Sequence, residues 1–520
     1  MTRARVPRTR VPRAPVSRPN TSATGRPERP DPCADPPTVT IDPTRVMPGL
    51  PYAVGAPGDD AAATVPRLRS VTPAGAGALG DGRVLAAGSA VGALGSLGCW
   101  LLAARTLPVE QLGRAVAVVA VVALAASAAR PDRGAALVQR VPAAGRQAGR
   151  VVVRSLAAAV ALGALAGAVL ALLVPGPAAT LSGAFADPPA TGGVAWLGVL
   201  LVAVAAAAWA VGGAHDGAVV ALDRPWWAVA HVATLAVSRA GLLLAVGAVL
   251  GTAATGGDLA AAWLAPVLVW ALPGAAAVAV LARRHARGAE VDGPGGATGT
   301  RAGRHGAPAH SSTPVQVLGP TAVARFGTTL LHHVAPLTVV LVAGPGPGML
   351  FFVAWQVVTA VDLAAVWVLG RPGGAGRTRL LVTLLPVLLV TALCARPLLA
   401  VFGPDYTPAA DVLRVLLVGA AFRLVVVHEL GEREASGRAW SSARLHLFTT
   451  VPTLLAVAVA IAVVAALRLV PTAVDAALPG AARAVLLPVA ATYVLVQVAC
   501  AAAVLVPRPP AGRARTEGQP

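Results

Sequence analysis

A polar stripe runs through one otherwise apolar stretch, residues 322–343. Arg325, Thr328, Thr329 and His332 are spaced at i, i+3, i+4 and i+7, so a helix would place all four side chains on one face. Ionisable groups inside a bilayer are costly and usually face a cavity or a partner. We therefore predict that this face lines a polar cavity and contributes to a binding site.

Three further charges interrupt apolar stretches, at Arg239, Asp362 and Arg423. Each is a functional candidate for the same reason. Structural alternatives stay open: Arg423 could pair with Asp362, and Arg325 could reach the membrane interface. His332 could exchange protons near neutral pH or simply hydrogen-bond between helices.

The composition indicates that lipid covers most of these helices. Of the 520 residues, 56% are hydrophobic and only 12% are charged, whereas soluble proteins carry about 25% charged residues. The formal net charge of +19 raises nucleic acid as a partner, but the arginines gather in a tail and in alternate loops, so we predict no nucleic-acid partner. The four cysteines lie far apart, so neither a metal site nor a disulfide is predicted.

A helix needs roughly 20 apolar residues to cross a bilayer, and about twelve segments qualify. The predicted fold class is therefore an all-α integral membrane protein with about twelve transmembrane helices in two six-helix bundles. The predicted segments are 84–104, 115–130, 152–174, 195–213, 228–251, 260–282, 322–343, 348–369, 380–402, 411–428, 446–467 and 485–506.

Arginine alternates along the connections between these segments, which predicts the topology. Positive loops stay on the cytoplasmic side of a membrane. We therefore predict a multi-pass protein of the cytoplasmic membrane with both termini in the cytoplasm. The arginine-rich connections are 130–154, 283–304, 371–379, 433–444 and 508–515, and the arginine-free ones are 176–194, 252–259 and 344–347.

The same pattern divides the chain into five parts. Residues 1–80 are rich in Pro and Arg and predict a disordered cytoplasmic tail, although a misassigned start is an open alternative. Bundles at 81–282 and 320–506 flank a cytoplasmic linker at 283–319, and 507–520 form a second tail. Six segments on each side of a linker indicate internal duplication, which is common in transporters.

Motifs for chemistry are missing from the sequence. It contains no Walker A loop, no HExxH or GxSxG motif and no paired-carboxylate site. The predicted external loops are too short to hold a catalytic domain. We therefore predict a protein that moves a substrate, not an enzyme, and one without a cofactor.

Three motifs resemble the polysaccharide flippases, which export lipid-linked oligosaccharides and are related to the multidrug/oligosaccharidyl-lipid/polysaccharide transporter superfamily. The motifs are Ala103–Ala115 (AARTLPVEQLGRA), Asp132–Arg140 (DRGAALVQR) and Leu398–Ala410 (LLAVFGPDYTPAA). The resemblance implies two six-helix bundles around a central cationic cavity, alternating access, and a substrate carried on a polyprenyl diphosphate.

On this resemblance, Arg325, His332 and Arg239 are expected to contact the lipid diphosphate, because guanidinium groups match phosphate oxygens. Thr328 and Thr329 would line the same cavity. The expected partners are the lipid-linked glycan, membrane lipids and glycan-assembly enzymes.

Two other functions remain open. One is a proton- or sodium-coupled small-molecule or multidrug antiporter, and the other is a non-transporting scaffold for glycan enzymes. An antiporter usually needs an acid in its first bundle, and none of the first six predicted segments contains Asp or Glu. This absence favours the flippase.

Overall fold

The computed structural model describes residues 75–129, 133–185, 193–291, 314–369, 376–436, 438–468 and 479–506. Most of the predicted tail and linker, and residues 507–520, lie outside the described residues. Throughout the described part the chain forms helices joined by turns, as predicted.

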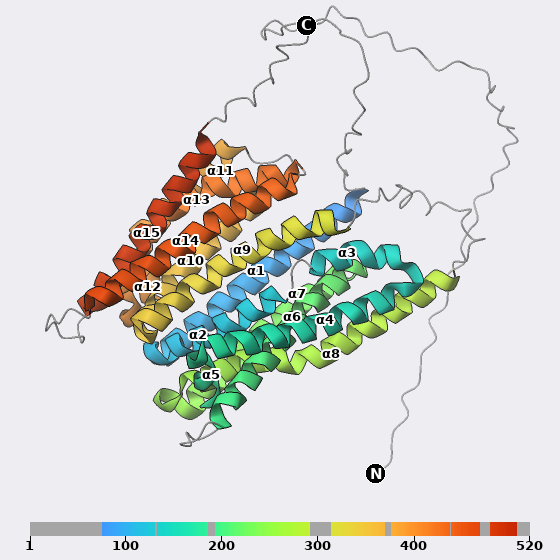
Figure 1. Ribbon diagram of the computed structural model, residues 1–520, viewed down its shortest axis with the longest axis horizontal. Helices are drawn as coiled ribbons and strands as arrows, with labels where there is room; N and C mark the ends of the chain where they lie inside the picture. The colour runs from blue at the N-terminus through green and yellow to red at the C-terminus, as the bar shows by residue number, and fades with distance from the viewer. Residues whose placement is uncertain are drawn as a thin grey trace, which may run out of the picture. The chain divides into compact units, whose positions relative to one another are not determined.

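The first half contains the following helices (Figure 1): α1 (Gly75–Thr106), α2 (Val109–Ala128), α3 (Arg133–Ala144), η1 (Gly145–Gln147), α4 (Ala148–Leu173), α5 (Pro175–Ser182), α6 (Gly193–Ala221), α7 (Pro225–Leu250), η2 (Gly251–Ala253) and α8 (Gly256–Val291). The second half contains α9 (Pro314–Ala343), α10 (Pro345–Leu369), α11 (Arg377–Leu393), α12 (Ala395–Ala400), η4 (Pro404–Ala409), α13 (Ala410–Ala435), α14 (Ala439–Arg468) and α15 (Pro479–Leu505).

All twelve predicted segments fall on these helices, which confirms the all-α membrane fold. Within the described residues, nine helices are long and apolar enough to cross a bilayer. The other three predicted segments coincide with α1, with α11 followed by α12, and with α13. The chain is therefore a multi-pass membrane protein.

At the turn between α9 and α10, a glycine ends one helix and a proline begins the next. Gly344 has a φ of +96°, which side chains with a Cβ rarely adopt, and Pro345 starts α10 directly after it. This turn brings α10 back alongside α9. An added Cβ at Gly113, in the second turn of α2, would clash with the carbonyl of Pro345, so α2 and the first turn of α10 touch backbone to backbone.

The two halves use the same helix contacts. In the first half α1 packs on α7, α6 on α8, and α7 on α8; in the second half α9 packs on α14, α13 on α15, and α14 on α15. Helix α2 contacts α9 and α10, and so links the halves. The repeated pattern supports the predicted duplication, whereas the exact domain boundaries stay a prediction.

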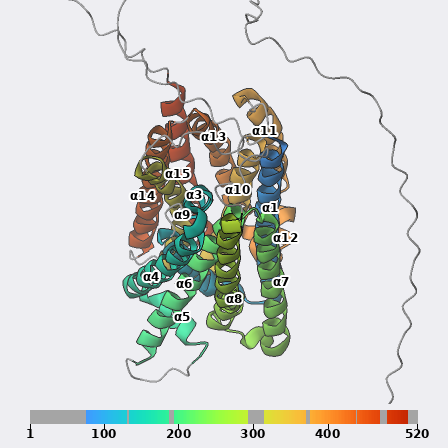
Figure 2. The ribbon, with the colours of Figure 1, turned by 90° about the vertical axis from the view of Figure 1, so that its right-hand side faces the viewer.

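A face of small residues lets α1 lie close to α7 (Figure 2). Added Cβ atoms at Gly88, Gly92 and Gly95 would fall 3.1, 2.9 and 2.6 Å from side-chain atoms of Val229, Val232 and Ala236. Such close approach is how helices gain van der Waals contact in a bilayer, where lipid removes the hydrophobic driving force between them. The face therefore serves helix association.

Replacing Gly95 with Ala should lower the melting temperature of the purified protein. The new methyl would meet Ala236 Cβ, which the α7 backbone holds in place, and overpacking of this kind costs about 1–3 kcal/mol. Gly98→Ala is the matched control, because an added Cβ there meets nothing within 4 Å. Equal melting temperatures for the two variants would contradict the described α1–α7 contact.

Candidate functional site

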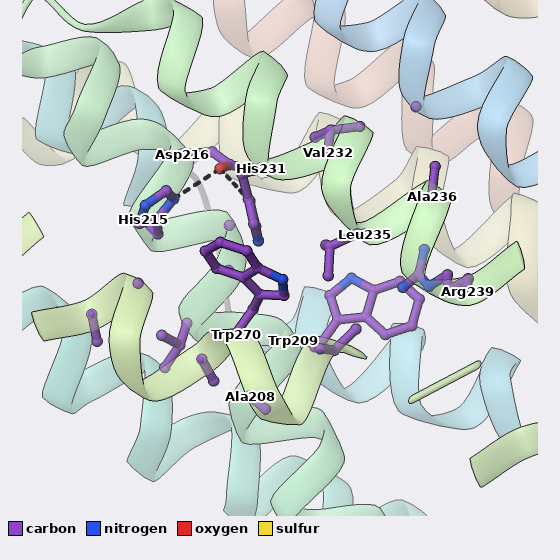
Figure 3. A pocket seen from close by; sticks show the side chains of 18 of the residues that line it. Ala208, Trp209, His215, Asp216, His231, Val232, Leu235, Ala236, Arg239 and Trp270 are labelled. Atoms are coloured by element: carbon purple, nitrogen blue, oxygen red, sulfur yellow. Dashed lines mark hydrogen bonds and ion pairs between the residues drawn. The ribbon is translucent and has the colours of Figure 1, made fainter. Parts of the chain in front are cut away.

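A cavity of about 170 Å³ lies among α1, α6, α7 and α8 in the first half (Figure 3). Polar groups reach it from three of these helices: Cys99 from α1, His215 and Asp216 from α6, and His231 and Arg239 from α7. We call it the first-half cavity. It holds a carboxylate cluster at one end and an arginine among tryptophans at the other.

The carboxylate cluster joins one acid to two histidines. Asp216 Oδ1 lies 3.0 Å from Nδ1 of His215 and 2.8 Å from Nδ1 of His231. The imidazoles are nearly buried, with 8% and 12% of their side-chain surface exposed, while Asp216 is 31% exposed. An ionised carboxylate only accepts hydrogen bonds, so each ring donates through Nδ1.

Local sequence explains why the three side chains meet. His215 and Asp216 lie in the last two turns of α6, and Pro225 starts α7 after a short turn, so His231 on the second turn of α7 faces back toward them. Glycines leave room for the rings: an added Cβ at Gly212 would meet the His231 ring at 3.5 Å.

These three residues could also hold a small cation. Their ligand atoms lie within 4.8 Å of one another, and two imidazoles with a carboxylate are a common ligand set for divalent metals. The sequence prediction of no metal site considered spacing along the chain, which does not reveal this set because fifteen residues separate Asp216 from His231. The arrangement can bind either a proton or a metal ion.

At the other end of the cavity, aromatic rings hold Arg239. Its guanidinium carbon lies 5.3 Å from the centre of the Trp209 ring and 4.8 Å from that of Trp263, and its Nε donates to the Trp263 carbonyl at 3.1 Å. Cation–π contacts offset part of the cost of burying this charge. Arg239 is therefore a fixed positive charge in the cavity wall.

A second polar cluster lies in the second half and is closely packed. Arg423 Nε donates to Asp362 Oδ2 at 2.6 Å, and Arg423 is only 4% exposed. His332 Nε2 is 3.7 Å from the same oxygen, too far for a hydrogen bond. Because arginine stays protonated, this carboxylate keeps a permanent counter-charge.

The predicted phosphate-binding residues do not form one group. Arg239 lines the first-half cavity, whereas His332 lies beside Asp362 in the second half. Thr328 donates to the Ala324 carbonyl of its own helix at 3.2 Å, and Thr329 lies next to it on α9. The side chain of Arg325 is outside the described residues. Contact of these residues with a diphosphate stays a prediction.

Sequence reasoning missed Asp216 and with it an acid in the first half. The fourth segment was predicted to end at residue 213, before the dipeptide His215-Asp216. Helix α6 instead continues to Ala221, and the candidate membrane span is Trp196–Ala221. The expectation that no span before the seventh contains an acid is therefore wrong, because the polar dipeptide was taken for a loop.

Internal duplication was the available signal. Helix α13 packs on α15 as α6 packs on α8, and it also carries a histidine followed by an acid, His428-Glu429. There Glu429 accepts a 2.8 Å hydrogen bond from Arg433 Nε, four residues along. Within the described residues, Asp216 thus contacts two histidines, whereas Glu429 contacts an arginine.

Comparison with known proteins supports the fold alone. No protein-family model matches the sequence, and no curated protein matches it. Among solved structures, an inward-facing multidrug resistance MATE family transporter of the MOP superfamily is 14% identical, with a TM-score of 0.51 over 79% of this chain and 93% of its own. A MATE protein in complex with MaL6 is 15% identical, with a TM-score of 0.47 over 82% of this chain and 95% of its own. The chain therefore has a MATE-like fold.

Proposed function

We propose that this protein is a cation-coupled antiporter that exports small molecules by alternating access. The MATE-like fold supports this function, because the solved structure with a TM-score of 0.51 is an inward-facing multidrug resistance transporter.

The observation that carries the proposal is the difference between the partners of Asp362 and those of Asp216. Asp362 has an arginine partner, which never releases its proton at physiological pH, so this carboxylate stays ionised. Asp216 is paired with two histidines, and because a histidine, unlike an arginine, can be neutral, this carboxylate has no permanent counter-charge. Of these two acids, Asp216 is therefore the one whose partners allow it to take up and release a cation during a transport cycle.

The size of the first-half cavity favours coupling over substrate binding at this place. Ligand pockets for drug-sized molecules occupy roughly 300–1,000 Å³. A volume of about 170 Å³ accommodates a proton relay, an ion or a few waters. We therefore assign His215, Asp216 and His231 to cation coupling, with the cargo binding elsewhere.

The lipid-linked oligosaccharide flippase is the second candidate. It is favoured by the motif Leu398–Ala410, which contains a tight turn where Gly403 has a φ of +143° and the Tyr406 side chain is buried. The expected diphosphate contacts at Arg239 and His332 lie in separate clusters, which weakens this candidate.

Transport by the purified full-length protein in liposomes separates the two functions. With an imposed proton gradient or, in a parallel series, a sodium gradient, we expect gradient-driven movement of the cationic dye ethidium, measured by fluorescence. We expect no transfer of a labelled polyprenyl-diphosphate sugar between leaflets. Sugar transfer without dye transport would reject the antiporter and establish the flippase.

A further inference from the structure

A second cavity, of about 750 Å³, lies between the start of α4 and the end of α8. We call it the basic cavity. Five arginines line it, and no acidic residue is among its lining. The arginines are Arg146, Arg150, Arg154, Arg283 and Arg287.

The helix geometry places these arginine side chains around the same cavity. Arg150 and Arg154 are four residues apart on α4, and Arg283 and Arg287 are four apart on α8, so each pair lies on one face of its helix. In the described part of the chain none of these four side chains forms an ion pair. Guanidinium groups that face each other repel, so the arrangement is most stable with an anion between them.

The backbone adds positive potential at the same place. Helix α4 is 26 residues long and begins directly after η1: the Gly145 carbonyl accepts the Ala148 N–H, and no side chain caps the first turn of α4. Gln147 and Gly149, at the start of this helix, line the basic cavity. Arg283 packs against Gly149: its Cγ lies 3.4 Å from the position that an added Cβ would take. Helix N-termini attract anions, phosphate in particular.

The basic cavity also borders the lipid-facing surface. Val153 lines it and is 42% exposed, and further along α4 the side chains of Leu165 and Leu172 are 61% and 57% exposed. Apolar side chains exposed on a membrane helix face acyl chains. A ligand that carries both a phosphate and acyl chains would contact the arginines and the exposed apolar side chains at this boundary. A free anion would contact the arginines alone.

From this juxtaposition we propose that the basic cavity binds the headgroup phosphate of an anionic phospholipid. The phosphate lies among the arginines at the first turn of α4, and the acyl chains lie along the exposed apolar face of the same helix. Arginine-rich connections predict that this end of the bundle faces the cytoplasm. The proposal is independent of the transported cargo.

The test removes one arginine from each helix with Arg150→Gln/Arg283→Gln in the full-length protein. Native mass spectrometry of detergent-purified protein counts bound phosphatidylglycerol against phosphatidylcholine. Each arginine near a lipid surface strengthens binding roughly fivefold, so the double variant should bind phosphatidylglycerol at least about tenfold more weakly. Phosphatidylcholine should bind weakly to every variant.

Arg379→Gln/Arg444→Gln is the matched control. It removes the same charge from α11 and α14, where both side chains are exposed, and should bind phosphatidylglycerol like the parent. Equal losses in both double variants, or none in the first, would overturn the proposal. Pyrophosphate binding that the first double variant loses, with phosphatidylglycerol binding unchanged in that variant, would show that the cavity takes free phosphates only, and would also overturn the proposal. Melting temperatures without added lipid verify that both variants fold.

Discussion

Asp216→Asn should abolish gradient-driven transport while the protein stays folded. Asparagine keeps the shape of the side chain, and its single oxygen can still accept a hydrogen bond from His215 or His231. It cannot bind and release a proton, and it lacks the negative charge that a sodium ion needs. Ethidium transport in liposomes should therefore fall to the level of protein-free liposomes.

The control for this variant is Asp405→Asn, which makes the same chemical change at an exposed position in η4. Its transport rate should equal that of the parent. His231→Gln should keep the carboxylate but replace one of its two imidazole partners, so transport should persist at a rate that differs from that of the parent. Normal transport by Asp216→Asn at every pH would exclude this cluster from coupling and, with it, the main support for the antiporter.

Most of the fold was predictable because the positions of membrane helices depend on hydropathy along the sequence. Hydropathy over windows of about 20 residues located all twelve segments, since lipid tolerates few polar side chains along a span. The turn at Gly344-Pro345 was also visible, because positive φ favours Gly and Pro suits the first turn of a helix. Bounds were less certain: α8 extends to Val291, nine residues beyond the predicted segment end at 282.

The candidate site was only partly predictable, because its members meet through tertiary contacts. Arg239 stood out as a charge within an apolar segment, but nothing in its neighbourhood along the chain revealed the rings of Trp209 and Trp263 beside it. Asp216 was missed because Gly212-Gly213 and His215 read as the end of a hydrophobic run. A helix packed in a bundle can continue through such residues, since polar side chains there face the protein interior.

The two halves differ in the partners of their acidic side chains. In the first half, histidines surround a partly exposed carboxylate beside a cavity. In the second half, Asp362 and Arg423 neutralise each other in a tightly packed interior. A permanent ion pair adds rigidity, whereas a carboxylate held by histidines has no permanent counter-charge and can bind a cation. We therefore expect the first half to respond to the cation and the second half to serve as its structural counterpart.

Asp362→Asn should strongly destabilise the protein. It would leave the Arg423 guanidinium buried, at 4% exposure, without its counter-charge. Breaking a buried pair by removing one partner costs about 3–5 kcal/mol. The melting temperature of the purified protein should therefore fall by several degrees. Asp411→Asn is the matched control: Asp411 pairs with Arg414 at 2.7 Å, but the two side chains are 33% and 45% exposed, and surface pairs contribute about 0–1 kcal/mol.

Replacing both partners should restore most of the lost stability. In Asp362→Leu/Arg423→Met no charge remains to be buried, and apolar replacements of buried pairs are often neutral or stabilising. Because the pair is a structural element in our proposal, this double variant should also retain gradient-driven ethidium transport in liposomes. A double variant that recovers its melting temperature but not its transport would instead place Asp362 and Arg423 in the transport cycle, alongside Asp216.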